Sequence, residues 1–218
     1  MSSLTHISET FSCLRLGEGL KSLVIVVGLP GVGKSTVLGE LEKEASKQGL
    51  KIQIVNYGTV MMSLAEESGR QVAHRDEMRK RSTSFQRELQ AEAARRIASM
   101  AEAFDGVTLV DTHMIVKAGS GYLPGLPSHV LSLLKPSLIA LIEAPSDSIL
   151  ARRLKDAEIR ERETPVAEEV EFEIQLSRVM AAACSALTGA PMMVVENLEG
   201  KAGEAAGRLL EAIKGVKG

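Results

Sequence analysis

The residues with the clearest chemical potential lie in one short loop, Gly28–Thr36, with the sequence GLPGVGKST. The loop fits the pattern of Gly, four residues, Gly, Lys and Ser or Thr, and it lies between an apolar run and an amphipathic stretch. Glycines let backbone N–H groups turn inward onto phosphate oxygens, and the N-terminus of the next helix adds partial positive charge. We expect a nucleoside triphosphate to be bound through Gly28, Pro30, Gly31, Val32, Gly33, Lys34, Ser35 and Thr36. The competing interpretation is a Gly-Pro turn before a helix that happens to contain a lysine.

Polar residues in and beyond this loop fit magnesium-assisted phosphate chemistry. Lys34 would bridge the β- and γ-phosphates, and the hydroxyl of Ser35 would bind Mg²⁺. Asp111 ends the apolar run Val107–Val110, where it would hold the metal directly or through water. The alternative for Asp111 is a carboxylate that caps the next turn. For His113, two residues later, a structural role is favoured over general-base catalysis.

Arginines gather in two further places. The clusters are Arg75, Arg79 and Arg81, and then Arg152, Arg153, Arg160 and Arg162. Acidic residues are interspersed in both, so a solvated helix of mixed charge is one interpretation. The other is a two-sided cationic clamp on polyphosphate, because the guanidinium fork grips phosphate oxygens in pairs. Two separate clusters favour two phosphate-bearing substrates.

Residues 119–127 form a Gly- and Pro-rich run, GSGYLPGLP, which predicts a rigid loop rather than a helix or strand. Ligands bind at the carboxyl ends of parallel strands, so this run is placed to contact the flat face of a base. A plain connection to the next helix explains the composition equally well.

The overall composition limits the class of protein. A net charge of −2 argues against a general nucleic-acid or anionic-membrane surface, so phosphate binding must depend on locally placed cations. Cys13 and Cys184 lie far apart and form neither a disulfide framework nor a metal site. No apolar run has transmembrane length, and residues 1–20 lack the order of a secretory signal. We expect a cytoplasmic protein without a membrane partner.

Short apolar runs alternate with longer helical stretches from Leu23 onward, which predicts an α/β fold with a five-stranded parallel sheet flanked by helices. The expected strands are Leu23–Val27, Lys51–Val55, Val107–Val110, Leu138–Ile142 and Met193–Val195. One long helix is expected from about Asp76. Another, between Glu168 and Leu187, has an apolar stripe of Phe172, Leu176, Val179, Met180, Ala183 and Leu187. We expect a weakly structured extension over residues 1–20 and one domain over 21–218.

Five ordered blocks together resemble the archaeal-type adenylate kinases, from about Ser22 to the C-terminus. They are the loop Gly28–Thr36, Asn56–Gly58, Arg75–Lys80, Asp111–His113 and Gly121–Pro127. The resemblance implies the reaction ATP + AMP ⇌ 2 ADP with Mg²⁺ and a phosphate-loop kinase fold. It also implies a mobile monophosphate-binding flap within about 57–105, a mobile lid at about 146–168, and a homotrimer.

The resemblance also implies roles for single residues. On the acceptor side, the AMP-binding residues are Asn56, Tyr57, Gly58, Thr59, Arg75, Arg79, Asp111, His113, Lys117, Leu123, Pro124 and Gly125. On the donor side, Arg152 would flank the adenine of ATP, while Arg160 and Arg162 would swing onto the phosphates. Lys34, Arg79, Arg152, Arg160 and Arg162 would be the catalytic residues.

This chain departs from the family pattern in two places. Lys117 stands where the family has an arginine, which replaces a fork with a point charge. The lid is one residue longer than in the family pattern, so the match of Arg160 and Arg162 to the family's two lid arginines could shift by one residue. Arg178 on the following helix is a further candidate for phosphate contact.

The implied mechanism is an in-line transfer to an AMP phosphate that is already anionic, so a strong general base is not needed. Three alternatives remain open. One is a kinase for CMP, UMP or GMP. Another is a GTPase or ATPase switch, although the chain has no Asn-Lys-x-Asp element. The third is a nucleotide sensor without turnover.

Overall fold

The computed structural model describes residues 21–70, 77–78, 81–119, 121–160 and 166–216, with the backbone alone for 156–160. The predictions for residues 1–20, Arg75, Arg79 and Arg162, and for the side chain of Arg160, lie outside these described parts.

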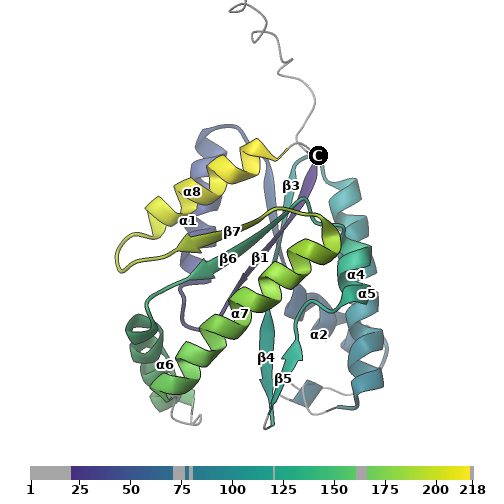
Figure 1. Cartoon of the computed structure of the whole chain (residues 1–218). Helices are drawn as coiled ribbons and strands as arrows, with labels where there is room; N and C mark the ends of the chain where they lie inside the picture. The colour runs from purple at the N-terminus through teal and green to yellow at the C-terminus, as the bar shows by residue number, and fades with distance from the viewer. Residues whose placement is uncertain (1–20, 71–76, 79–80, 120, 161–165, 217–218) are drawn as a thin grey trace, which may run out of the picture.

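The centre of the molecule is a five-stranded parallel sheet with the order β2-β3-β1-β6-β7 (Figure 1). The strands are β1 (Ser22–Gly28), β2 (Ile52–Asn56), β3 (Val107–Thr112), β6 (Leu138–Glu143) and β7 (Met192–Glu196). All five match the apolar runs in the sequence, so the predicted fold class is confirmed. Because β1 lies between β3 and β6, the loop that follows β1 emerges at the middle of the sheet.

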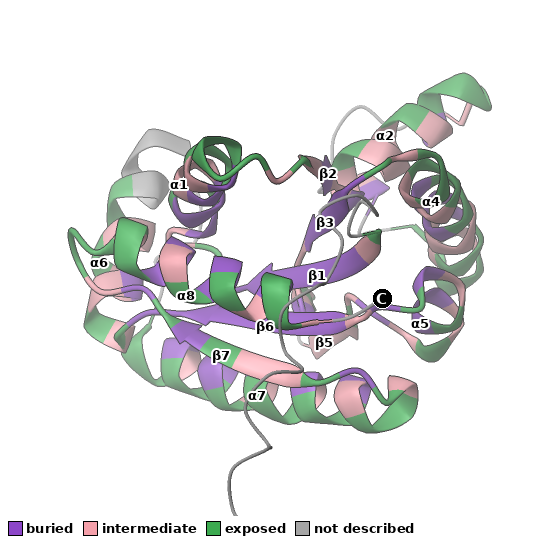
Figure 2. Cartoon of the chain, turned by 90° about the horizontal axis from the view of Figure 1, so that it is seen from above, coloured by how far each residue is buried: buried purple, intermediate pink, exposed green. Residues whose placement is uncertain are grey.

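Helices cover both faces of the sheet, which is why the inner strands are apolar throughout. Val24 and Val26 of β1 pack in one core with α1 (Lys34–Lys47) and α8 (Ala202–Gly215). Ile25 and Val27 point the other way, into a second core with α4 (Thr83–Ala103), α5 (Ser128–Leu134) and part of α7 (Ala167–Thr188). Figure 2 shows the inner strands β1, β3 and β6 largely buried and the outer sides of the helices exposed.

Two further helices extend from the carboxyl end of the sheet. They are α2 (Tyr57–Glu67), after β2, and α6 (Ser146–Arg160), after β6. Cys184 is buried in the second core, and burial raises the pKa of its thiol. None of the described helices combines the length and apolar character needed to cross a bilayer.

Two helical predictions were wrong in detail. The long helix α4 begins at Thr83 rather than near Asp76, because the hydroxyl of Ser82 accepts the N–H of Phe85 at 3.3 Å and caps the helix. On α7 the predicted stripe is split: Phe172, Val179 and Leu187 are exposed, whereas Leu176 and Met180 are partly buried against the core. The buried face consists of Val170, Glu173, Ile174, Ser177, Ala181 and Cys184. Apolar residues on both faces give the helix two possible stripes, and the sheet packs against the one with more small residues.

The run 119–127 also differs from the prediction of a loop. Residues Gly121–Pro124 form β5, which pairs antiparallel with β4 (Ile115–Ala118) in a separate hairpin (Figure 1). Gly119 has a φ of +59° at the turn, which a glycine adopts without strain. Because side chains alternate along a strand, the hairpin has two different faces.

Candidate active site

The phosphate-loop motif occupies the turn between β1 and α1. Gly31 and Gly33 have φ angles of +94° and +81°, a region that favours glycine. Helix α1 begins at Lys34 with no side chain capping its N-terminus. Its first turn therefore presents backbone N–H groups and a partial positive charge to whatever occupies the loop.

Lys34 points across the sheet to Asp111. The two residues form an ion pair, and the side chain of each is about nine-tenths buried. Parallel pairing explains the contact, because Val26 of β1 lies opposite Asp111 of β3, which ends beside the loop. The structure thus brings together the predicted lysine and carboxylate.

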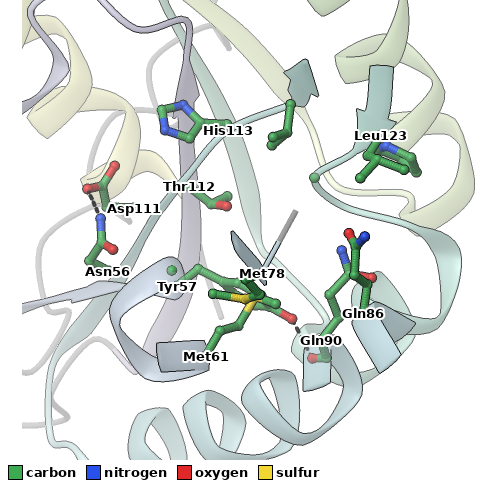
Figure 3. Close-up of a pocket in the computed structure, with 14 residues that line it drawn as sticks. Asn56, Tyr57, Met61, Met78, Gln86, Gln90, Asp111, Thr112, His113 and Leu123 are labelled. Atoms are coloured by element: carbon green, nitrogen blue, oxygen red, sulfur yellow. Dashed lines mark hydrogen bonds between the residues drawn. The ribbon is translucent and has the colours of Figure 1, made fainter. Parts of the chain in front are cut away.

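Asp111 also contacts the neighbouring strand β2. The side-chain amide of Asn56 donates to the Asp111 carboxylate at 2.7 Å (Figure 3). The Oδ1 atom of Asn56 accepts both the backbone N–H and the hydroxyl of Thr59 at 3.0 Å, which caps α2. Asn56 therefore joins the end of the central sheet to the first turn of α2.

A cavity opens on this side of the sheet, between α2, α4 and the hairpin. Its lining residues are Asn56, Tyr57, Gly58, Met61, Met78, Gln86, Gln90, Asp111, Thr112, His113, Val116, Leu123, Pro124 and Gly125. Eight of them were predicted as acceptor-site residues. Thr59 does not line the cavity but supports it through the Asn56 cap.

Sequence reasoning missed Met61, Met78, Gln86, Gln90, Thr112 and Val116 as cavity residues. Gln86 and Gln90 are one helical turn apart on α4, so both reach the same wall of the cavity (Figure 3). The spacing of these two glutamines, four residues apart beside the apolar stripe of α4, was the feature of the sequence from which they could have been predicted as cavity residues. Met61 and Met78 form the apolar floor in the same view.

Tyr57 and His113, which both line the cavity, each form a hydrogen bond to the backbone of another segment. The hydroxyl of Tyr57 donates to the backbone carbonyl of Gln90 at 2.5 Å, and burial raises the pKa of this tyrosine. Nδ1 of His113 lies 2.8 Å from the carbonyl oxygen of Gly28, so this nitrogen donates to the first residue of the loop. The contact favours a structural role for His113. A side chain at Gly125 would overlap the His113 carbonyl, which explains that glycine.

Other predicted cations point elsewhere. Lys117 forms an ion pair with Glu169 on α7, because it lies on the hairpin face opposite to Val116 and the cavity. Both nitrogens of the Arg178 fork contact Glu143 at the end of β6, at 2.7 and 2.6 Å.

Arg152 is held against the phosphate loop. Its guanidinium donates to the Gly31 carbonyl at 2.9 Å and pairs with Glu199. The neighbouring Arg153, a member of the second arginine cluster without an assigned role, donates to the carbonyl of Pro30 at 2.9 Å.

The residues at the loop fit a magnesium ion that is bound mainly by phosphate oxygens. Ser35 is exposed and has a hydroxyl, and the carboxylate of Asp111, which pairs with the adjacent Lys34, is an oxygen ligand of the type that Mg²⁺ prefers. Among the described residues there is no cluster of three or more His, Cys, Asp or Glu side chains that could form an all-protein metal site. A hydroxyl and one carboxylate are consistent with an ion brought in by its nucleotide.

A model of the AAA domain family matches residues 27–171 of the chain. Among curated proteins, the adenylate kinase of Methanopyrus kandleri is 44% identical over 194 residues, which is 89% of this chain and 98% of that protein. The adenylate kinase of Methanocaldococcus jannaschii is 42% identical over 192 residues, or 88% and 98% of the two chains. That of Saccharolobus solfataricus is 42% identical over 194 residues, or 87% and 97%.

Among solved structures, shikimate kinase from Acinetobacter baumannii superposes with a TM-score of 0.55. The match covers 90% of this chain and 95% of the other at 15% identity, which shows a shared fold. The adenylate kinases, by contrast, match along nearly their whole length at 42–44% identity. The chain therefore belongs to the archaeal adenylate kinases, a family of phosphotransferases.

Proposed function

We propose that this enzyme transfers the γ-phosphoryl group of ATP to AMP and forms two ADP, with Mg²⁺ bound to the donor. The observation that supports this most directly is the position of Asp111. Its carboxylate contacts Lys34 of the phosphate loop on one side and Asn56 of the acceptor cavity on the other. A triphosphate in the loop and a monophosphate in the cavity would therefore meet near this carboxylate.

The loop Gly28–Thr36 would bind the triphosphate. Lys34 would exchange its pairing with Asp111 for the β- and γ-phosphates, which keeps its positive charge compensated in both states. Magnesium, held by Ser35 and Asp111, would supply further positive charge against the phosphates. An oxygen of the AMP phosphate would then attack the γ-phosphorus as the bond to the bridging oxygen breaks.

The cavity would take AMP with its base toward α4. Met61, Met78 and Leu123 offer apolar contact to a flat ring, and Gln86 and Gln90 provide amides that can pair with ring edges. In the same proposal, Arg75 and Arg79 would bind the AMP phosphate. The lid at 146–168, with Arg160 and Arg162, would close over the phosphates and exclude water.

We further propose that the enzyme is a homotrimer and acts in the cytoplasm. The trimer rests on the family resemblance and is supported by the outward face of α7. Phe172, Val179 and Leu187 share that face and are 56%, 65% and 69% exposed. Exposed apolar side chains gathered along one helix are typical of a surface that meets another chain.

The proposed reaction is tested by measuring ADP formed from ATP and Mg²⁺ with AMP, CMP, UMP or GMP as the acceptor. We expect AMP to be the preferred acceptor and two ADP to form for each ATP consumed. Preference for another monophosphate would reassign the acceptor. Loss of ATP at the same rate without any acceptor would indicate a hydrolase, and tight binding without turnover would indicate a sensor.

A further inference from the structure

Three consecutive carbonyl groups of the phosphate loop are held by side chains from outside the loop. Nε of Arg153 donates to the carbonyl of Pro30 at 2.9 Å, and the guanidinium of Arg152 donates to that of Gly31 at 2.9 Å. The amide of Asn197 donates to the carbonyl of Val32 at 2.8 Å. The two arginines come from α6, and Asn197 follows β7.

These contacts determine how the loop presents its N–H groups. In a trans peptide unit the C=O and the following N–H point in opposite directions. Holding the carbonyls of residues 30 and 32 outward therefore aims the N–H groups of Gly31 and Gly33 toward the other side of the loop. The N–H of Val32 instead donates to the carbonyl of Leu29 across the turn at 3.3 Å. Gly31 and Gly33 adopt the positive φ angles that this backbone path requires.

The side chains that hold the loop are themselves anchored. Arg153 forms an ion pair of 2.7 Å with Glu173, and both side chains are largely buried. Asn197 is 4% exposed, and its backbone N–H donates to the carbonyl of Glu143 at 2.7 Å. A Cβ at Gly33 would lie 2.5 Å from the Asn197 amide nitrogen. Gly33 is thus needed for this close approach as well as for its backbone conformation.

We propose that Arg153 and Asn197 are positioning residues for the donor triphosphate, which they reach only through the backbone of the phosphate loop. The inference rests on the proposed function of that loop. It adds two residues that contact no substrate and that lie about 120 and 165 positions away in the sequence from the carbonyls they hold. Arg152 shares the same geometry but also has a proposed contact with the adenine, so it is a poorer test.

The experiment compares the binding of Mg-ATP and of magnesium tripolyphosphate, which has no base, by isothermal titration calorimetry. The variants are Asn197→Ala, Arg153→Met and the milder Arg153→Lys, which retains a positive charge for Glu173. Arg208→Met, at an exposed arginine of α8, is the matched control. Thermal unfolding of each variant shows whether it folds.

We expect the affinities for ATP and for tripolyphosphate to fall together, by about tenfold in Asn197→Ala and Arg153→Met. Arg153→Lys should recover part of the loss, and Arg208→Met should match the wild type. In steady-state assays the KM for ATP should rise while the KM for AMP changes less than about twofold, a split that general destabilisation would not produce.

Other results would overturn the proposal. The Oδ1 atom of Asn197 is buried without a hydrogen-bond partner. If this atom binds the donor base, Asn197→Ala will weaken ATP binding and leave tripolyphosphate binding unchanged. If the folded Asn197→Ala and Arg153→Met variants bind ATP and tripolyphosphate as tightly as the wild type does, that result would also contradict the proposed positioning role. If the wild type binds neither ligand, the proposed function of the loop fails instead, and if it binds ATP alone, the loop amides do not carry the affinity.

Discussion

The side-chain amide of Asn56 donates a hydrogen bond of 2.7 Å to the carboxylate of Asp111, which in turn pairs with Lys34. Asn56 ends β2, Asp111 lies near the end of β3, and Lys34 begins α1, which follows β1. The three side chains thus form a continuous chain of contacts from the phosphate loop to the acceptor cavity. Parallel register produces this arrangement, because Asn56 lies opposite Asp111, and Asp111 lies opposite Val26 of the central strand. A change at either end of this chain of contacts is expected to affect the other end.

Asn56 has two separable roles, and two substitutions distinguish them. Asn56→Ala removes both the cap of α2 and the bond to Asp111, so we expect the free energy of unfolding to fall by about 1 kcal/mol. Asn56→Ser retains a capping oxygen but loses the amide, so stability should be nearly unchanged. Both variants should raise the KM for AMP more than the KM for ATP in steady-state assays. Wild-type KM values in Asn56→Ser would show that the hydrogen bond from Asn56 to Asp111 does not contribute to acceptor binding.

Gln90 is expected to contribute to the choice of acceptor base. Its side chain lines the cavity, and losing one well-placed hydrogen bond to a base costs about tenfold in kcat/KM. We therefore expect Gln90→Leu to lower kcat/KM for AMP by about that factor and to narrow the preference over CMP, UMP and GMP. Gln48→Leu is the control, because Gln48 lies on the surface at the end of α1. Unchanged base preference in Gln90→Leu would exclude this role.

Glu173 is the buried acidic partner of Arg153, and we expect its loss to lower the free energy of unfolding more than the loss of an exposed acidic partner. Its buried carboxylate pairs with Arg153 and accepts a hydrogen bond from the hydroxyl of Tyr122 at 3.3 Å. Burial of Tyr122, together with the negative charges of Glu173 and Glu169, raises the pKa of this tyrosine to about 12. Glu173→Ala leaves a largely buried guanidinium without its counter-ion, so we expect a loss of about 3 kcal/mol in urea unfolding.

Glu169→Ala is the matched control for Glu173→Ala on the same helix. The ion pair of Glu169 with Lys117 is more exposed, so its loss should cost less than about 1 kcal/mol. Equal losses in the two variants would mean that burial of the Arg153 pair does not determine its contribution.

The outward face of α7 is expected to be the contact between chains. We expect the wild type to sediment as three chains and Val179→Glu to dissociate, because a carboxylate would be buried without a counter-ion. Arg208→Glu, at an exposed position of α8, should remain assembled. A wild type that sediments as one chain over the micromolar range would refute the trimer.

The sequence predicted the central sheet and the glycine-rich turn between β1 and α1 well, because both follow local rules. Apolar runs of three to five residues identified the strands that are covered on both faces, and the glycine spacing before Lys34 identified a turn whose backbone needs positive φ at Gly31 and Gly33. The position of Asp111 followed from the strand that precedes it. These features depend on neighbours in the chain, so one sequence was sufficient.

The parts that the sequence did not predict depend on contacts between distant segments. Both faces of α7 carry apolar residues, so the spacing of Phe172 and Val179 could not show which face the sheet covers. Asn197 acts through a backbone carbonyl 165 residues earlier, and such a contact leaves no pattern of residue types. Lys117 was assigned by family position, whereas the alternation of the hairpin directs it toward Glu169.

The most direct test of the account is a crystal structure with a two-headed dinucleotide inhibitor, in which two adenosines are joined by a chain of phosphates. We predict that one half will lie with its phosphates on the loop beside Lys34. The other half will fill the cavity between Tyr57 and Gln90, with the phosphate chain passing Asp111. An inhibitor with only one half bound in a pocket, and the other in solvent, would contradict the proposed transfer between two nucleotides.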